Sequence, residues 1–368
     1  MNVSADYRRI ITLAVTAALI GLFVFLGMTV QVPYVALGPG PTVNTLGNVE
    51  ISDGKAPDGK KLERTVPVVD IQGVPTDPTN GHLNLTTVSV TDDIRLFDAL
   101  SLWASREYSL TPRESQYPPG RSREQVKERN TAQMTGSELT AQAAALRQVH
   151  RPTKLAITSV GKGGPSDGLL RKDDEVRAVA GTPVSTVEEM QQAVREHKPG
   201  EKIDVDVVRD GQPQRVTITL GKVEGTDKAG QPKTVSFLDV APAVVNADPA
   251  MKITMNVGDI GGPSAGLMLS LAIVDRLTPG SLTGGKFIAG TGTITDDGKV
   301  GPIGGITHKM AAARDAGAET FLVPADNCGE AMSDVPKGLR VVKVDTLPGA
   351  IDSLNAVNAG KPAPTCSR

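Results

Sequence analysis

The hydrophobic positions form one long uninterrupted segment near the start of the chain and many short segments after it. Residues 10–30 carry no charge, and a helix of about 20 apolar residues crosses a bilayer. Arg8 and Arg9 precede this segment, and no basic residue follows it before Lys55. The positive-inside rule therefore predicts a transmembrane helix at 10–30, with residues 1–9 as a cytoplasmic tail and the bulk of the chain extracytoplasmic. A cleaved signal peptide is the alternative, although its apolar core usually spans only about 7–15 residues.

Residues 31–149 alternate between apolar strand-like runs and helical spacing, which predicts a juxtamembrane and N-terminal α/β region. Prolines and glycines at 33–42 predict an ordered, non-helical segment. The expected elements are strands at 66–72 and 83–90, a helix at 92–108, and a second helix whose Ser/Thr-x-x-Glu capping box is Thr135-Gly136-Ser137-Glu138.

Residues 150–224 predict a separate unit. A strand at 155–160 precedes a glycine turn, a helix is expected from Ser185 because Glu188 completes a capping box, and alternating residues flank an Asp210-Gly211 hairpin turn. The run GGPSDGLLRKDDEVRAVAGTPV, with the helix and hairpin after it, resembles a PDZ domain. That resemblance implies binding of extended peptides by strand addition. No glycine-hydrophobic carboxylate-binding loop is visible before Leu155, which argues against capture of C-terminal peptides. A packing or spacer role is the alternative to peptide binding.

Residues 225–359 alternate strand and helix patterns, which predicts an α/β layer. The expected strands are 235–245, 253–257, 286–295, 320–324 and 339–344, and the expected helices are 264–277, 306–316, 328–333 and 347–357. Residues 360–368 are expected to be a disordered tail. The predicted fold class is therefore a multidomain α+β and α/β protein with an N-terminal transmembrane helix.

Composition and charge narrow the choice of partners. The net charge of −2 gives no indication of a nucleic-acid partner. Cys328 and Cys366 fit neither a disulfide framework nor a zinc or redox spacing, so no metal site is expected. One disulfide between them and two free thiols remain equally open.

The candidate chemistry lies between two glycine turns. Gly261, Gly262 and Pro263 precede Ser264 and Ala265 at the start of an apolar helix. A serine there is exposed on a tight turn, and the free N–H groups of the helix start can face an oxyanion. Gly262, Pro263 and Ala265 are therefore the candidate turn and oxyanion residues.

The candidate base is a lysine on the second turn. Lys309 follows Pro302-Ile303-Gly304-Gly305-Ile306 and precedes an alanine-rich helix. Burial among small apolar residues would lower its pKa and make the amine a useful base. We therefore expect Ser264 and Lys309 to meet as a nucleophile–base pair.

Two other catalytic interpretations start from the same serine. Gly262-Pro263-Ser264-Ala265-Gly266 also matches the G-x-S-x-G elbow of α/β-hydrolases, in which His308 would be the base. A proline inside the elbow and the distance from the preceding strand argue against it. The S-x-x-K pattern of penicillin-binding proteins fails, since Leu267 occupies the lysine position.

GGPSAGLMLSLAIVD, followed by GTGTITDDGKVGPIGGITHKMAAARDAGAETFLVP, closely resembles the proteolytic domain of Lon (endopeptidase La) over roughly 240–350. The resemblance implies Ser264 as nucleophile, Lys309 as general base and Thr291 as the hydroxyl that positions the lysine. The whole arrangement is similar to the YlbL-like family of membrane-anchored PDZ–Lon proteins. Lon commonly has a charged residue before the Gly-Pro-Ser turn, whereas this chain has Gly261 there and Asp259 two positions earlier.

These patterns predict a membrane-anchored serine endopeptidase that cleaves unfolded or membrane-associated polypeptides. No G-x-x-x-x-G-K-[ST] phosphate loop occurs in the sequence, so we expect no ATP use within this chain and no cofactor. A homo-oligomer, hexameric by analogy with Lon, is expected. The alternatives are a catalytically inactive PDZ scaffold with a Lon-like structural domain, and a protein that cleaves only itself.

Overall fold

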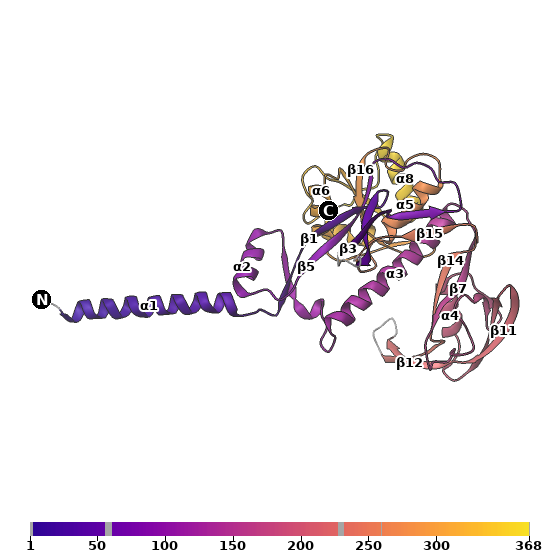
Figure 1. Ribbon diagram of the computed structural model, residues 1–368, viewed down its shortest axis with the longest axis horizontal. Coiled ribbons are helices and arrows are strands. Elements are labelled where there is room, and N and C mark those ends of the chain that lie inside the picture. The colour runs from indigo at the N-terminus through magenta and orange to yellow at the C-terminus, as the bar shows by residue number, and fades with distance from the viewer. Residues whose placement is uncertain (1–2, 56–60, 227–231, 259, 368) are drawn as a thin grey trace.

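The computed structural model describes residues 3–55, 61–226, 232–258 and 260–367. Figure 1 shows a long helix, α1 (Val3–Thr29), that stands apart from a folded body with two parts. The stretch Tyr7–Thr29 of α1 is long and apolar enough to cross a membrane, and only 6% of its most apolar window is buried. By length and composition this helix fits a membrane anchor or a signal sequence.

The larger part is built on a six-stranded sheet with the order β20-β19-β16-β5-β1-β6. Its strands are β1 (Tyr34–Asn44), β5 (His82–Thr91), β6 (Ser109–Pro112), β16 (Phe287–Gly290), β19 (Thr320–Pro324) and β20 (Arg340–Val344). Three of them come from the region expected at 31–149 and three from the region expected at 225–359. The prediction that 31–149 is a region of its own is therefore wrong, because β5 pairs in parallel with β16 and closes one sheet from both segments.

Helices cover both faces of this sheet. Successive residues of β16 point to opposite faces, so Ile288 lies in one hydrophobic cluster and Ala289 in another. The first cluster contains α5 (Gly266–Leu277) and α8 (Leu347–Asn358), and the second contains α6 (Ile306–Asp315) and α7 (Cys328–Ala331). The expected α/β layer is confirmed.

The smaller part is the unit predicted to resemble a PDZ domain. Its sheet has the order β11-β10-β8-β7-β14, with β9 (Thr182–Pro183) beside β8, and the helix α4 (Val187–Arg195) packs on it. The strands are β7 (Thr153–Val160), β8 (Glu175–Val179), β10 (Lys202–Arg209), β11 (Gln212–Thr219) and β14 (Val240–Asn246). Helix α4 is capped by Thr186 and Glu189, one residue later than expected.

Strand β14 lies beyond the predicted boundary at residue 224. It was expected in the proteolytic unit, but it pairs with β7 along its whole length and buries Val244 in the core of the smaller part. The boundary is therefore wrong on its C-terminal side. The sequence pattern of β14 identifies a strand but does not identify its partner.

A single long helix, α3 (Arg123–Gln148), runs between the two parts (Figure 1). Its capping box consists of Ser122 and Gln125, so the start predicted at Thr135–Glu138 is wrong by more than three turns. The first half of α3 is largely exposed and polar, and it lacks the apolar spacing that would reveal a helix.

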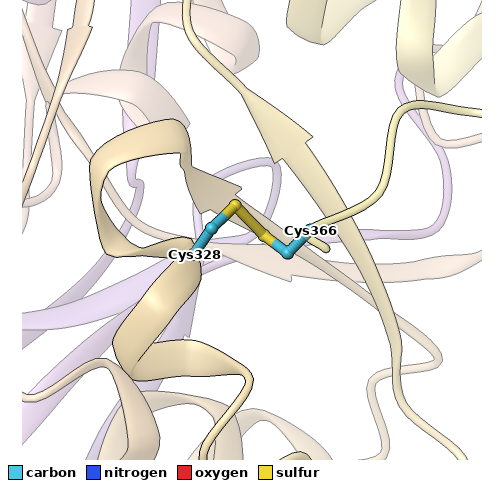
Figure 2. Close-up of a disulfide and its surroundings, with 2 residues drawn as sticks. All are labelled: Cys328 and Cys366. Atoms are coloured by element: carbon cyan, nitrogen blue, oxygen red, sulfur yellow. A yellow bond between two sulfur atoms is a disulfide. The ribbon is translucent and has the colours of Figure 1, made fainter. Parts of the chain in front are cut away.

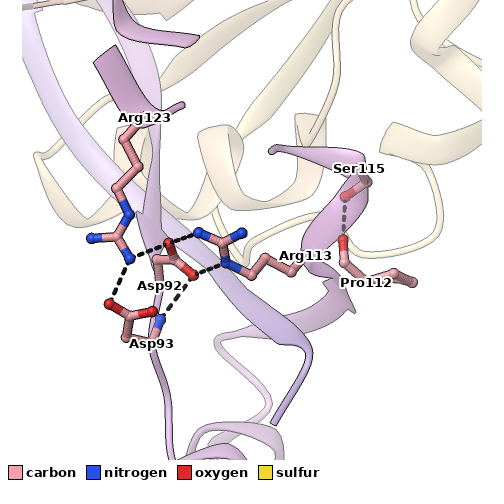
Figure 3. Close-up of polar contacts among 6 residues, drawn as sticks. All are labelled: Asp92, Asp93, Pro112, Arg113, Ser115 and Arg123. Atoms are coloured by element: carbon pink, nitrogen blue, oxygen red, sulfur yellow. Dashed lines mark hydrogen bonds and ion pairs between the residues drawn. The ribbon is translucent and has the colours of Figure 1, made fainter. Parts of the chain in front are cut away.

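An ion cluster fixes the beginning of α3 to the sheet (Figure 3). Asp92, directly after β5, lies 2.9 Å from Arg113 Nε and 2.8 Å from Arg123 NH2. Its side chain is only 9% exposed, and the hydrogen bond from Arg113 holds the pKa of the carboxyl below its ordinary value. These contacts connect β5, the 3-10 turn η1 (Arg113–Ser115) and α3.

The C-terminal residues are ordered as far as residue 367. Cys328 and Cys366 form a disulfide, with their Cα atoms 5.2 Å apart (Figure 2). The Lys343 N–H donates to Pro364 O at 2.9 Å, and Cys366 lies buried in the cluster that contains α6 and α7. The prediction of a disordered tail at 360–368 is therefore wrong, because the disulfide and this cluster hold the segment in place.

The remaining elements are short. They are α2 (Leu96–Ser105), β2 (Asn48–Lys55), β3 (Lys61–Pro67), β4 (Val69–Gln72), β12 (Gly221–Thr226), β13 (Pro232–Phe237), β15 (Lys252–Met255), β17 (Thr293–Ile294), β18 (Val300–Gly301) and the 3-10 turn η2 (Ala325–Asn327).

Candidate active site

The amine of Lys309 lies inside the larger part, on the first turns of α6. The residue is 3% exposed. Its Nζ lies 2.9 Å from Ser264 Oγ, 3.2 Å from Thr291 Oγ1 and 3.0 Å from Thr86 O. The structure thus brings together all three side chains that the sequence singled out, and it adds a backbone carbonyl from β5.

The turn before Ser264 is held by α3. Gly262 has φ of +92°, a conformation that side chains rarely adopt, and its N–H donates to Asn130 O at 3.0 Å. Ser137 Oγ donates to Pro263 O at 3.1 Å. Ser137, part of the wrongly predicted capping box, therefore supports the turn from the middle of a helix.

Ser264 itself is half-buried and directly precedes the first turn of α5. Its carbonyl oxygen accepts from Gly292 N at 2.9 Å and from Thr291 Oγ1 at 3.1 Å. These two bonds fix the backbone of the serine while its hydroxyl faces Lys309. Ser264 precedes the N-terminus of α5, whose positive dipole end favours a developing oxyanion.

The entry of α6 positions the lysine. Gly305, with φ of +69°, is the N-cap, and an added Cβ there would lie 2.9 Å from Val88 Cγ2. Asn327 holds the segment just before it, accepting from Ile303 N and donating to Ile303 O. Lys309 then follows one turn into the helix.

Burial lowers the pKa of Lys309 from its ordinary value of 10.5 to about 8. A neutral amine has two protons and one lone pair. It can donate to Thr86 O and Thr291 Oγ1 and accept the proton of Ser264 Oγ, and Thr291 still donates to Ser264 O. Every hydrogen bond at the site is then satisfied by one assignment of protons, which leaves the amine ready to take the serine proton.

The elbow interpretation with His308 as base is wrong. His308 Nε2 lies 2.8 Å from Ser109 Oγ on β6, so this ring bonds away from the nucleophile candidate. The two neighbouring residues His308 and Lys309 point to different partners because successive residues of a helix face different directions.

One functional contact has no sequence signal. The carbonyl of Thr86 belongs to a strand of β-branched residues that was predicted only as a strand. Asp259 lies outside the described residues. Among the residues that the structure describes, no group of three or more His, Cys, Asp or Glu side chains is arranged to hold a metal ion.

Comparison with known proteins identifies two domains. Residues 243–353 match the Lon protease (S16) C-terminal proteolytic domain, and residues 128–220 match the PDZ domain. A Lon protease of Campylobacter concisus is 39% identical over 90 residues, covering 23% of this chain and 11% of that protein. A Lon protease of Geobacter metallireducens is 38% identical over 117 residues, covering 28% and 14%.

The chain therefore spans only 11% to 14% of the length of these two relatives. Among solved structures, the PDZ domain of an SdrC-like protein from Listeria monocytogenes is 17% identical, with a TM-score of 0.20, and the likeness covers 24% of this chain and 86% of that one. On its matched residues, this chain combines a PDZ domain with a proteolytic domain of the Lon (S16) family.

Proposed function

We propose that this protein is a membrane-anchored serine endopeptidase that works without ATP. The observation that carries the proposal is the contact of 2.9 Å between Ser264 Oγ and the buried amine of Lys309, whose pKa is about 8. The Lon-type domain and the names of its relatives support peptide hydrolysis.

The mechanism follows from the hydrogen bonds at the site. Lys309 takes the proton of Ser264 as Oγ attacks the carbonyl carbon of the scissile peptide bond. The oxyanion in this scheme faces the positive end of α5 and the N–H groups of Ser264 and Ala265, because Pro263 has no N–H and the Gly262 N–H already donates to Asn130 O. The protonated lysine then gives its proton to the leaving amine, which leaves an acyl group on Ser264. Water attacks this ester, and Lys309 again takes and returns the proton.

Thr291 is the positioning residue in this scheme. Its hydroxyl accepts from Lys309 and donates to Ser264 O, so it connects the side chain of the base to the backbone of the nucleophile. Thr86 O holds the third position around the amine. With two acceptors fixed, the lone pair of the neutral amine points at Ser264.

The proposed location is the outer face of a membrane. In this proposal helix α1 is the single span, and the positive-inside rule applied to Arg8 and Arg9 supports a cytoplasmic N-terminus. The Cys328–Cys366 disulfide supports this placement, because disulfides persist in oxidising compartments. Unfolded or membrane-associated polypeptides are the proposed substrates, presented by the PDZ domain, and a ring of six copies is proposed by analogy alone.

A serine-reactive fluorophosphonate probe and an unfolded protein substrate test the proposal. Wild type is expected to react with the probe and to degrade the substrate equally with and without ATP. Ser264→Ala and Lys309→Met are each expected to lose both activities. Methionine is unbranched, only one atom shorter than lysine, and needs no buried charge, so the melting temperature of Lys309→Met should stay close to that of wild type.

Three outcomes would contradict the proposal. A wild-type chain that is folded but unreactive would favour the inactive PDZ scaffold. Full turnover by Lys309→Met would remove the amine from the mechanism. Cleavage of the chain itself without cleavage of an added substrate would limit the activity to self-processing.

A further inference from the structure

Helix α2 (Leu96–Ser105) is fixed to the end of the apolar helix α1. Leu96 N–H donates to Val30 O and Val32 N–H donates to Ile94 O, both at 3.1 Å, and Gln31 forms a β-bridge with Arg95. Figure 1 shows α2 at the C-terminal end of α1, between that helix and the rest of the molecule. The N-terminus of α2 therefore lies next to the C-terminus of α1 in space.

The first turn of α2 packs against the last turns of α1. The rings of Phe97 and Phe23 pack edge-on with their centroids 5.5 Å apart. Phe97 also fills the space beside Gly27, where an added Cβ would lie 2.3 Å from its ring. Phe23 precedes Thr29 by six residues, which is about 9 Å at 1.5 Å per residue. Phe97 thus lies level with a part of α1 that would be inside the bilayer.

The faces of α2 differ in what they contact. Ala99 and Leu102 pack inward, against the cluster that contains Ala36 and Ile94. Leu96, Leu100 and Trp103 have the spacing i, i+4, i+7 and share the neighbouring face of α2. Leu100 is 48% and Trp103 is 67% exposed.

This second face continues into a wider apolar surface. Leu96, Leu100 and Trp103 line a hollow of about 380 Å³, whose other lining residues are Val32, Tyr34, Ala99 and Leu110. Val30 and Tyr34 are also more than two-fifths exposed. The polar residue of the first turn, Asp98, uses one oxygen to accept from Arg95 N. Exposed apolar residues grouped beside a helix that is proposed to span the membrane suit an apolar partner.

We propose that this face of α2 inserts into the lipid leaflet in which α1 ends. The proposal rests on the membrane anchoring proposed above. Trp103 would sit at the headgroup level, where tryptophan is enriched, and the exposed Arg95 and Arg106 at the two ends of α2 suit lipid phosphates. A single span lets the folded body swivel, whereas a span and an interfacial helix together fix its orientation. The active site is then held at a constant height above the bilayer.

The chain contains one tryptophan, so Trp103 is its own reporter. The full-length protein is reconstituted in phosphatidylcholine–phosphatidylglycerol vesicles at about one copy per vesicle, and Trp103 fluorescence is quenched by lipids with a nitroxide near the headgroup or by aqueous acrylamide. The matched control is the double variant Trp103→Phe, Leu169→Trp, which moves the tryptophan to an exposed position of the PDZ domain (Leu169 is 41% exposed).

We expect strong quenching of Trp103 by the nitroxide lipid and weak quenching by acrylamide, with the reverse order in the control. Leu100→Ser should reduce the nitroxide quenching severalfold while hydrolysis of a small soluble peptide stays unchanged. Equal quenching of Trp103 and the control by acrylamide would overturn the proposal. Protection from both quenchers would also overturn it, since protein would then cover the face.

A separate measurement keeps the two proposals distinguishable. Retention of the chain in vesicles after alkaline carbonate extraction reports on α1 alone. Release by carbonate would refute the anchor, and with it the docking of α2. Retention together with an acrylamide-quenched Trp103 would refute only the docking.

Discussion

At the scale of single residues, the site depends on the protonation state of Lys309. Its pKa is about 8 in the folded protein, and only the neutral amine accepts the serine proton. We therefore expect kcat/KM to rise with pH and to reach half its maximum near pH 8. A pH–rate profile with a small peptide substrate measures this, and a profile already flat from pH 6 to 9 would contradict it.

The same pKa has a consequence for stability. Between about pH 8 and 10.5 the unfolded chain binds a proton that the folded chain has lost, so the free energy of unfolding rises with pH across this window, by at most about 3 kcal/mol. Lys309→Met should remove this part of the pH dependence. Denaturant titrations of wild type and Lys309→Met at pH 8 and pH 10 measure the free energy of unfolding. They provide an independent check of the Lys309 pKa that is inferred from the pH–rate profile.

The hydroxyl of Thr291 can be tested separately from its shape. Thr291→Val keeps the volume but removes the bonds to Lys309 Nζ and Ser264 O. A hydrogen bond to a charged group contributes about 1.5–3 kcal/mol, so we expect kcat to fall about tenfold to a hundredfold with KM little changed. Thr291→Ser retains the hydroxyl and should stay close to wild type. Equal kcat for the two variants would show that the hydroxyl does not position the base.

The sequence pattern predicts the catalytic side chains of such a site better than it predicts the backbone groups that contact them. Ser264 and Lys309 stand out because their glycine turns and apolar surroundings are visible in the sequence. Thr86 O and Gly292 N contribute through the backbone, and any residue type supplies the carbonyl and any type except proline the N–H. Their contribution depends on which strands lie beside each other, and this is decided by long-range pairing such as that of β5 with β16.

At the scale of elements, α3 shows the limit of local pattern. The capping signal at Thr135–Glu138 is real as a sequence motif, but Ser122 already caps the helix and the chain continues through Gly136. What holds the first half of α3 in place is tertiary. Asn130 O accepts from Gly262 N, and Arg123 pairs with Asp92. Such contacts override propensity, and they lie far apart in the sequence.

The second half of α3 joins the two domains at a polar contact. Arg147 donates to Ser185 O just before α4 and to Asp296 O after β17. Ile294 of β17 contacts the start of α5, where a Cβ added to Gly266 would lie 2.8 Å from Ile294 Cγ2. Asp296, which contacts α4 of the PDZ domain, is therefore two residues away from Ile294, which contacts the helix that follows Ser264.

At the scale of the whole molecule, the smaller part, which carries most of the PDZ match, is an insertion in the larger part, which carries most of the Lon match. The chain enters the smaller part through β7 and leaves it through β14, and these strands pair antiparallel, with Thr153 opposite Asn246. Just outside them, the Ala247 N–H donates to Pro152 O at 3.0 Å. The two parts also have separate hydrophobic clusters, and among the described residues Ala143 of α3 is the one member of the smaller part's cluster from outside 153–246. Because the inserted segment begins and ends at neighbouring positions and has its own hydrophobic cluster, we expect the larger part to fold without it.

This arrangement allows a clean excision. Replacing residues 153–246 by a two-residue Asn-Gly turn would join neighbouring antiparallel chains with a turn that suits them. The excised protein should keep a cooperative melting transition and wild-type reaction of Ser264 with the probe, because the proteolytic sheet and the Lys309 contacts lie outside the excised segment. The loss of Asp296 contacts to α4 and the exposure of Ala143 should lower the melting temperature only slightly.

Long substrates should respond differently from the small probe. If the PDZ domain holds a polypeptide near Ser264, its loss lowers the effective substrate concentration, and degradation of an unfolded protein should slow by roughly a hundredfold, the lower end of the range for linked binding modules. The excised chain with Ser264→Ala measures background cleavage. Undiminished degradation of long substrates by the folded, excised protein would assign the PDZ domain a spacer role, and the surface beside Ser264 would then have to select substrates alone.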